Sequence, residues 1–400
     1  MTATIRSPNR VHLIAHAGPP RADIARFGFA DAGQYIAFVR RQLPAPLRLT
    51  CARRFFEVEE DEPRGGRGDD AARVRDLQAA LDDPRTLAIV AAKGGAYFAR
   101  ILPHLNFSML AKRRTPLWAV GFSEMTTLVN VVASYRGGRG LYWLCPNYLA
   151  WKIRPARQAR EAFAEFWRSL PMVVNAAGTE PRPSGSGPKH KNMAALSRSR
   201  FGSGGHAEPG HIQLGPIHGE LALGKARSGA IQVIGGCLSV LAAALTGPPM
   251  RRVKPDDRWL LIEDINEMPY RIDRYLAALK IAGWFDRIAG VLVGDFHTNR
   301  NVAADPRVGR QQENQVRSVI EILKLHLPRG RRLPVVTTRS IGHVWPMLPV
   351  PINTPLRMSV ARRAVTIASG VTKWEGNKAT GQQRNKAPPS PQQQSNKVTR

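Results

Sequence analysis

Two glycines close an apolar run in the first quarter of the chain and form a turn that could carry chemistry. Gly94 and Gly95 follow the apolar residues 86–92, TLAIVAA, and precede a stretch led by Ala99 that is typical of a helix. A strand that turns tightly into a helix exposes one side chain at the bend and directs backbone N–H groups toward it, where a developing oxyanion can be held. A plain turn that needs glycine only for its backbone angles is the alternative interpretation.

The elements around this turn follow a strand-and-helix pattern through the first half of the chain. Short apolar runs at residues 11–18, 86–95 and 116–124 indicate buried strands, each ending in a turn. Residues 69–83 place Val74, Leu77 and Leu81 on one helical face, and residues 125–135 predict a second helix. Repeated strand-and-helix units of this kind indicate an α/β domain.

A second α/β region follows in the second half. Strands are predicted at residues 230–236, 258–267 and 288–296, and helices at residues 237–245 and 270–285. We therefore predict an N-terminal α/β domain over residues 1–175 and a C-terminal domain over 213–371. Residues 176–212, rich in Pro, Gly, Ser and basic side chains, predict a flexible linker or insertion, and the Gln/Pro/Lys-rich residues 372–400 predict a disordered tail. Residues 299–332 form a second long connection.

Composition narrows the class of protein. Apolar residues make up 43% of the chain, enough for two cores, and no apolar run reaches the length of a membrane span. The first twenty residues lack a signal-peptide core, so we expect a cytoplasmic protein without membrane partners. The formal net charge is +29, but the basic residues are scattered and no nucleic-acid-binding signature accompanies them, which makes a nucleic-acid partner the weaker interpretation. Cys51, Cys145 and Cys237 are far apart, with no Cys or His ligand spacing, so we predict no disulfide framework and no metal site. We also expect no cofactor.

Several short sequence blocks occur in order along residues 11–360. They are Lys93-Gly94-Gly95 with Arg100-Ile101-Leu102-Pro103, Gly121-Phe122-Ser123-Glu124-Met125-Thr126, Gly235-Gly236-Cys237-Leu238-Ser239, Leu261-Ile262-Glu263-Asp264, Tyr270-Arg271-Ile272-Asp273-Arg274, and Gly342-His343. Together these blocks resemble the LD-carboxypeptidase family, which includes muramoyltetrapeptide carboxypeptidases and microcin C immunity-type serine peptidases. The resemblance implies an N-terminal Rossmann-like domain, a C-terminal mixed α/β domain and an active-site cleft between them.

The resemblance also implies roles for individual residues. Glu263 and His343 take the positions of the relay that activates a serine nucleophile, and the nucleophile position falls on Ala99 or, alternatively, Phe98, neither of which has a hydroxyl. Gly94, Gly95, Ser123 and Gly236 are expected at the substrate, with Ser123 in a structural hydrogen-bonding role. Four residues are weaker alternatives for a replacement nucleophile. They are Ser123, for which the structural role is favoured, Ser108, which falls beyond the elbow helix, Tyr97, and Cys237, whose thiol pKa a helix N-terminus could lower.

Two functional hypotheses follow from the resemblance. The first is a serine-type hydrolase, a carboxypeptidase of peptidoglycan recycling that cleaves the amide bond to a D-amino acid in murein-derived peptides. The second is a non-catalytic pseudoenzyme of the same fold that only binds a peptide or muropeptide, favoured by the missing hydroxyl at residues 98 and 99. In both, the partner is a small peptide. The family resemblance is also compatible with a homodimer.

Overall fold

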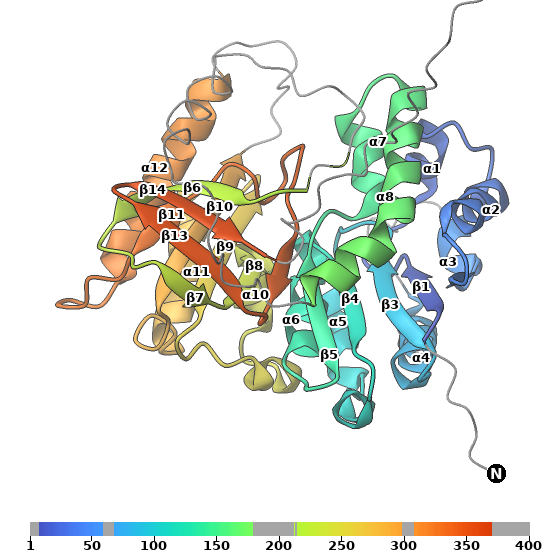
Figure 1. Ribbon diagram of the computed structural model, residues 1–400, viewed down its shortest axis with the longest axis horizontal. Coiled ribbons are helices and arrows are strands. Elements are labelled where there is room, and N and C mark those ends of the chain that lie inside the picture. The colour runs from blue at the N-terminus through green and yellow to red at the C-terminus, as the bar shows by residue number, and fades with distance from the viewer. Residues whose placement is uncertain (1–7, 59–67, 179–211, 213, 298–307, 370–400) are drawn as a thin grey trace, which may run out of the picture.

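One large sheet runs through the whole molecule. The computed structural model describes residues 8–58, 68–178, 212, 214–297 and 308–369 of the 400. Within these residues the strands follow the order β2-β1-β3-β4-β5-β12-β8-β9-β10-β11-β6-β14-β13-β7. Figure 1 shows the two halves of the chain side by side, with blue to green N-terminal elements next to yellow to red C-terminal ones. The predicted α/β class is therefore confirmed.

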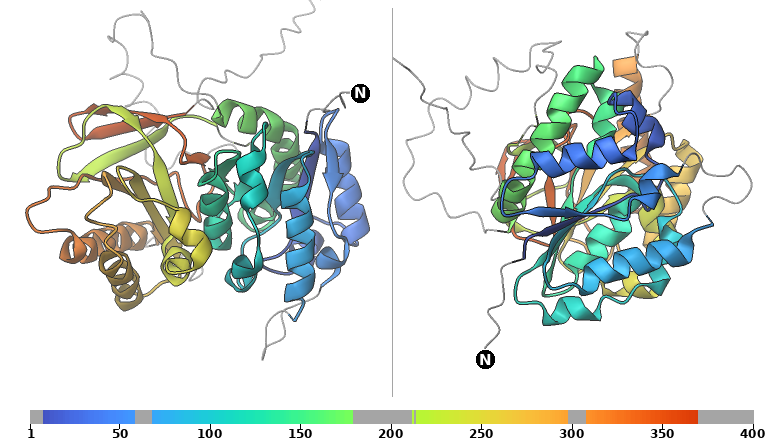
Figure 2. Two further views of the ribbon diagram at one scale, coloured as in Figure 1. Left: turned by 90° about the horizontal axis from the view of Figure 1, so that it is seen from below. Right: turned by 90° about the vertical axis from the view of Figure 1, so that its right-hand side faces the viewer.

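The N-terminal half is a parallel sheet covered by helices on both faces (Figure 2). Its central strands, β3 and β4, are nearly continuous apolar runs because both faces of the sheet are buried there. In order they are β1 (Arg10–Ile14), β2 (Arg48–Thr50), β3 (Thr86–Ala91), β4 (Leu117–Gly121) and β5 (Gly138–Tyr142). The helices are α1 (Arg21–Arg26), α2 (Ala32–Gln42), α3 (Arg54–Glu57), α4 (Asp70–Asp82), α5 (Phe98–Ile101), α6 (Thr126–Ala133), α7 (Leu149–Lys152) and α8 (Ala156–Ala177).

The C-terminal half combines a parallel sheet with an antiparallel extension. The parallel strands are β8 (Val233–Cys237), β9 (Trp259–Ile265), β10 (Gly290–His297) and β11 (Val335–Thr337). The antiparallel strands are β6 (Ile217–Leu223), β14 (Ala364–Ala368), β13 (Leu356–Ala361) and β7 (Gly229–Ile231). The helices are α10 (Leu238–Ala244), α11 (Pro269–Ile281) and α12 (Val308–His326).

A short strand from near the C-terminal end joins the two halves. β12 (Val350–Ile352) pairs antiparallel with β5 and parallel with β8. Behind this joint the side chain of Asn130 on α6 bonds both backbone groups of Gly235 on β8, accepting from its N–H at 2.9 Å and donating to its carbonyl at 2.8 Å. The halves are thus tied by both backbone and side-chain hydrogen bonds, and the relative position of α6 and β8 is fixed.

The sequence predicted the main elements better than their ends. The five predicted helices are present as α4, α5, α6, α10 and α11, whereas the strand predicted over residues 11–18 ends at Ile14, where its pairing with β3 ends. The connection 299–332 contains the helix α12, which was not predicted. Of the predicted linker 176–212 only residues 176–178 and 212 are described, and the predicted tail 372–400 lies outside the described residues. No helix in the described part of the chain is both long and apolar enough to cross a bilayer.

Candidate active site

The turn after β4 presents a serine in a strained conformation. The strand ends at Gly121, and Ser123 comes two residues later. Ser123 has a φ of 59° and begins the short 3-10 helix η3 (Ser123–Met125), which leads into α6. Positive φ is uncommon for a residue with a side chain and is found where the surrounding structure enforces it. Gly121 allows the bend because a Cβ there would lie 2.9 Å from the Met125 side chain. This strand, Gly-X-Ser and helix sequence is the arrangement of a nucleophile elbow.

An imidazole and a buried carboxylate extend from this serine. The Nε2 of His343 lies 3.1 Å from the Oγ of Ser123, and its Nδ1 lies 2.8 Å from the Oε2 of Glu263. Glu263 is fully buried and His343 is only 6% exposed. A carboxylate can only accept, so the imidazole proton belongs on Nδ1 and Nε2 is free to accept from the serine hydroxyl. The three side chains form a serine, histidine and glutamate relay.

Close backbone packing fixes the relay carboxylate. Glu263 lies on β9, between β8 and β10. A Cβ added to Gly294 would lie 3.0 Å from the Cβ of Glu263. A Cβ on Gly342, which has a φ of 116°, would lie 2.7 Å from the Glu263 Oε2. His343, the next residue, is held by its carbonyl, which accepts a hydrogen bond from the Tyr148 hydroxyl, and by the Phe122 ring 4.8 Å away. The glycine before His343 is therefore needed for the carboxylate and the imidazole to meet.

The loop after β3 approaches the serine from the other side. A Cβ on Gly94 would lie 2.9 Å from the Ser123 Cβ, and a Cβ on Gly95, which has a φ of 140°, would lie 2.5 Å from the Ala17 carbonyl oxygen. Gly95 faces the same cavity as Ser123. The N–H of Glu124, which follows the serine at the start of a helix, has no intrahelical partner. Backbone N–H groups of Glu124 and of this loop can therefore hold an oxyanion next to Ser123.

Residues 98 and 99, where the nucleophile was expected, do not lie next to the imidazole of His343. Phe98 is fully buried, and neither Phe98 nor Ala99 lines the cavity that contains Ser123 and His343. The N–H groups of Phe98 and Ala99 instead donate to the Oε1 of Glu124, at 3.0 and 3.3 Å. The hydroxyl that contacts His343 comes from the elbow after β4, one strand further along the sheet. The sequence did contain the signal for it, a strand followed by Gly-Phe-Ser and a helix.

The other sequence-predicted residues fall into two groups. Gly95 and Ser123 line the cavity and Gly94 lies against Ser123, whereas Gly236 is buried behind them, where a Cβ would be 2.5 Å from the Tyr142 ring. Cys237 is buried, and burial, with added repulsion from Asp264 and Glu263, raises its thiol pKa well above the usual value. The thiol is therefore kept protonated, which is the opposite of what a replacement nucleophile needs.

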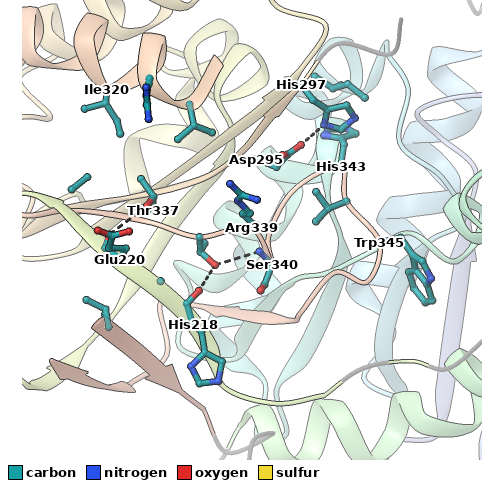
Figure 3. Close-up of a pocket in the computed structure, with 18 of the residues that line it drawn as sticks. His218, Glu220, Asp295, His297, Ile320, Thr337, Arg339, Ser340, His343 and Trp345 are labelled. Carbon is teal, nitrogen blue, oxygen red and sulfur yellow. Dashed lines mark hydrogen bonds and ion pairs between the residues drawn. The ribbon is translucent and has the colours of Figure 1, made fainter. Parts of the chain in front are cut away.

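A cavity of about 1950 Å³ opens in front of the serine and is lined by both halves of the chain. Its wall includes aromatic side chains, with Trp151 and Tyr148 on the N-terminal side and Trp345 on the C-terminal side. Figure 3 shows the polar part of the wall, to which Asp295, Arg339, Ser340 and His343 all contribute. A mixed aromatic and polar cavity of this size suits a peptide-like molecule.

Sequence reasoning missed several residues of this wall. Asp295 and His297 form a buried hydrogen-bonded pair on β10, and both line the cavity. Lys152, at the end of α7, also lines it, with its ammonium group 5.0 Å from the Tyr148 ring centroid. The DFH triplet at residues 295–297, two polar residues at the end of an apolar strand, was the only local signal; Lys152 had none. Among the described residues, no group of three or more His, Cys, Asp and Glu side chains could hold a metal ion.

An elbow serine, an imidazole and a buried carboxylate on an α/β scaffold form the arrangement used by serine-type hydrolases. Two family models match the chain, described as the LD-carboxypeptidase N-terminal domain, over residues 11–142, and the LD-carboxypeptidase C-terminal domain, over residues 232–358. The chain therefore belongs to the LD-carboxypeptidase family, which is a family of peptidases.

Individual relatives agree with this assignment. The chain is 26% identical over 339 residues to a Bacillus subtilis protein named "Probable murein peptide carboxypeptidase", covering 82% of this chain and 89% of the relative. Two solved structures share the fold. Muramoyltetrapeptide carboxypeptidase from Oxalobacter formigenes is 18% identical, with a TM-score of 0.52 over 90% of this chain and 99% of the other. The microcin C7 self-immunity protein MccF, in complex with aspartyl sulfamoyl adenosine, is 15% identical, with a TM-score of 0.56 over 92% and 97%.

Proposed function

We propose that this protein is an active serine-type carboxypeptidase that hydrolyses the amide bond to a C-terminal D-amino acid in murein-derived peptides. The observation that carries the proposal is the 3.1 Å contact between the Ser123 hydroxyl and a His343 imidazole that is itself held by Glu263. A serine hydroxyl is a weak nucleophile until a neighbouring base takes its proton. The three side chains supply that base and keep it in the useful tautomer.

The proposed reaction follows from the positions of these groups. The Ser123 Oγ adds to the scissile carbonyl carbon while the His343 Nε2, 3.1 Å away, takes its proton. The carbonyl oxygen becomes an oxyanion that the N–H groups of Glu124 and the Gly94-Gly95 loop stabilise. The intermediate then releases the D-amino acid, whose amine takes the proton from His343. A water activated by the same imidazole hydrolyses the acyl-enzyme and regenerates Ser123.

The substrate class is supported by the relatives and by the charge of the cavity wall. One relative is named a probable murein peptide carboxypeptidase, and the microcin C7 self-immunity protein MccF was solved with aspartyl sulfamoyl adenosine, so both names refer to small molecules that contain amino acids. A peptide with a free C-terminus brings a carboxylate close to the scissile bond. Lys152 lines the cavity, and among the described residues no carboxylate forms an ion pair with it. We propose that its ammonium group receives the substrate's terminal carboxylate.

The non-catalytic alternative rested on the lack of a hydroxyl at residues 98 and 99. Because Ser123 supplies a hydroxyl in contact with His343, that basis is removed, and the hydrolase is the function that the geometry supports better. The cytoplasmic location, the homodimer and the lack of a nucleic-acid partner stay predictions.

The decisive experiment measures release of D-alanine from an L,D-linked murein tetrapeptide. We expect turnover by the wild-type protein and a loss of at least about 10⁴-fold in kcat for Ser123→Ala and for His343→Ala, because the relay acts as a unit. Ser108→Ala, which removes an exposed serine hydroxyl outside the cavity, is the matched control and should keep full activity. Ala99→Ser tests the other elbow and should neither raise wild-type activity nor restore activity to Ser123→Ala.

The opposite results would be equally clear. Binding of the tetrapeptide without release of D-alanine would favour the non-catalytic protein. Turnover that survives Ser123→Ala would mean that another group attacks the carbonyl.

A further inference from the structure

A buried tyrosine hydroxyl connects the two ends of the relay. Tyr142 is the last residue of β5 and is fully buried. Its hydroxyl lies 2.5 Å from the Oε1 of Glu263 and 3.3 Å from the backbone nitrogen of Ser123. Together with the two contacts of His343 these bonds close a ring, from the Ser123 Oγ through His343, Glu263 and Tyr142 back to the Ser123 N–H.

The direction of each bond in this ring is fixed by donor chemistry. The Ser123 N–H can only donate, so the Tyr142 oxygen accepts from it and the tyrosine proton goes to Glu263. Burial, followed by the charge of Glu263, raises the pKa of Tyr142 well above its usual value, and the phenol therefore stays protonated. The Glu263 carboxylate receives one hydrogen bond on each oxygen, from Tyr142 on Oε1 and from His343 on Oε2.

The position of the tyrosine ring is set by its neighbours. A Cβ on Gly236, which has a φ of 143°, would lie 2.5 Å from the Tyr142 Cε2 and 2.8 Å from its Cζ. The same Cβ would lie 2.9 Å from the Thr126 Oγ1, and that hydroxyl donates to the Ser123 carbonyl at 2.6 Å. The glycine on β8 therefore leaves room for the ring, while Thr126 holds the other side of the Ser123 backbone.

We propose that Tyr142 is a positioning residue of the relay, which holds the strained backbone of Ser123 and the carboxylate of Glu263 in register with each other. The inference rests on the proposed function only for its kinetic consequence, because the ring of hydrogen bonds exists without substrate. Tyr142 does not line the cavity, so its loss should alter the chemical step and leave substrate binding nearly unchanged.

The hydrogen bond from Tyr142 also affects the imidazole. By donating to one oxygen of Glu263 it disperses part of the negative charge that the other oxygen presents to His343. Removing the phenol hydroxyl should therefore strengthen the bond between the His343 Nδ1–H and Glu263. A stronger bond of this kind moves the imidazole N–H proton resonance further downfield in the NMR spectrum.

The test compares Tyr142→Phe with Tyr275→Phe in the full chain. Tyr275 is a matched control because its hydroxyl also donates to a carboxylate, Glu267, at 3.4 Å, but outside the cavity. For Tyr142→Phe we expect kcat to fall about 10- to 100-fold with KM within about twofold, as for a misplaced catalytic group. We also expect the His343 N–H resonance to move downfield. Tyr275→Phe should leave both unchanged.

A second variant keeps the test open if Tyr142→Phe does not fold. Fluorotyrosine introduced at residue 142 keeps the ring and the hydrogen bond but makes the phenol a stronger donor, so the His343 resonance should move upfield. An unchanged resonance in both variants, or an unchanged kcat in a folded Tyr142→Phe, would overturn the positioning role. Because the NMR measurement needs no turnover, it decides this inference even if the tetrapeptide is not hydrolysed.

Discussion

Three bonds from different elements hold Ser123 in its strained conformation. Its N–H donates to Tyr142 on β5, its carbonyl accepts from Thr126 on α6 at 2.6 Å, and its hydroxyl contacts His343 from the C-terminal half. A residue at a φ of 59° persists when such contacts over-determine it. The hydroxyl is therefore aimed at the imidazole before any substrate arrives, and little reorganisation is needed at the moment of attack.

Lys152 offers a test of how the cavity selects its substrate. Burial lowers the pKa of Lys152, and the charge of Asp295 partly offsets this effect. We expect Lys152→Met to raise the KM for a tetrapeptide with a free C-terminal carboxylate about 10- to 100-fold, the value of one charge-assisted hydrogen bond. The KM for the corresponding C-terminal amide should not change, because that substrate has no terminal carboxylate for Lys152 to bind.

Paired measurements on carboxylate and amide substrates would check this prediction. Lys280→Met is the control, since Lys280 is exposed on α11 and donates to the Leu325 carbonyl away from the cavity. Loss of the carboxylate preference in Arg339→Met, with the preference intact in Lys152→Met, would assign the role to Arg339 instead.

At the scale of elements, the site depends on the joint between α6 and β8. α6 begins just after the elbow, and β8 pairs with β9, the strand that carries Glu263. The Asn130 side chain spans this joint with its two bonds to Gly235, and the Cys237 N–H donates to the Thr126 hydroxyl at 3.0 Å. These bonds keep the serine of one half within reach of the carboxylate of the other.

Asn130→Asp would test this joint. An aspartate can still accept from the Gly235 N–H, but it places a carboxylate oxygen where the amide nitrogen donated to the Gly235 carbonyl, and Asn130 is buried. We expect the free energy of unfolding to fall by about 2–4 kcal/mol, as for a buried polar pair that is left unsatisfied. Urea unfolding of wild type and variant gives this value, and Asn106→Asp on the surface is a control expected within about 0.5 kcal/mol of wild type.

Elements also show how far the sequence could lead. Periodicity was enough for α4, α10 and α11, because each buries one apolar side, and an apolar run was enough for α6, which is buried along its whole length. In contrast, β12 has only three residues and pairs with strands from distant parts of the chain. The family resemblance indicated Glu263 and His343, which the structure brings together. The resemblance placed the nucleophile on the elbow after β3, however. Both elbows carry glycines, and only the three-dimensional contact with His343 distinguishes the elbow after β4 from the elbow after β3. Tyr142 carried no sequence signal, since its role depends on its contacts with β9 and with the elbow backbone.

At the scale of the whole molecule, pH acts on stability through a partly buried carboxylate that links a helix to the sheet. The Oδ2 of Asp76 on α4 lies 3.1 Å from the Nε2 of His12 and 3.1 Å from the Nε2 of His16. Burial by itself would raise the pKa of Asp76, but the hydrogen bonds and charges of the two histidines outweigh it, so the pKa lies well below the usual value. An acid with a lowered folded-state pKa stabilises the protein when it is ionised in both states.

The sign of the pH dependence follows from this shift. Above pH ~4, where an unfolded aspartate is ionised, the full contribution of Asp76 is present, and it is lost as the pH falls below that value toward the folded-state pKa. We expect Asp76→Ala to be less stable than wild type by about 2 kcal/mol at neutral pH, the size of a hydrogen bond to a charged group, and the difference to shrink steadily below pH ~4. Urea unfolding across this range measures it. Asp82→Ala is the control, because it removes an exposed carboxylate from the same helix, and its stability should follow the wild-type curve. If the stability difference of Asp76→Ala stayed constant down to strongly acid pH, packing and not the charge would hold α4 to the sheet.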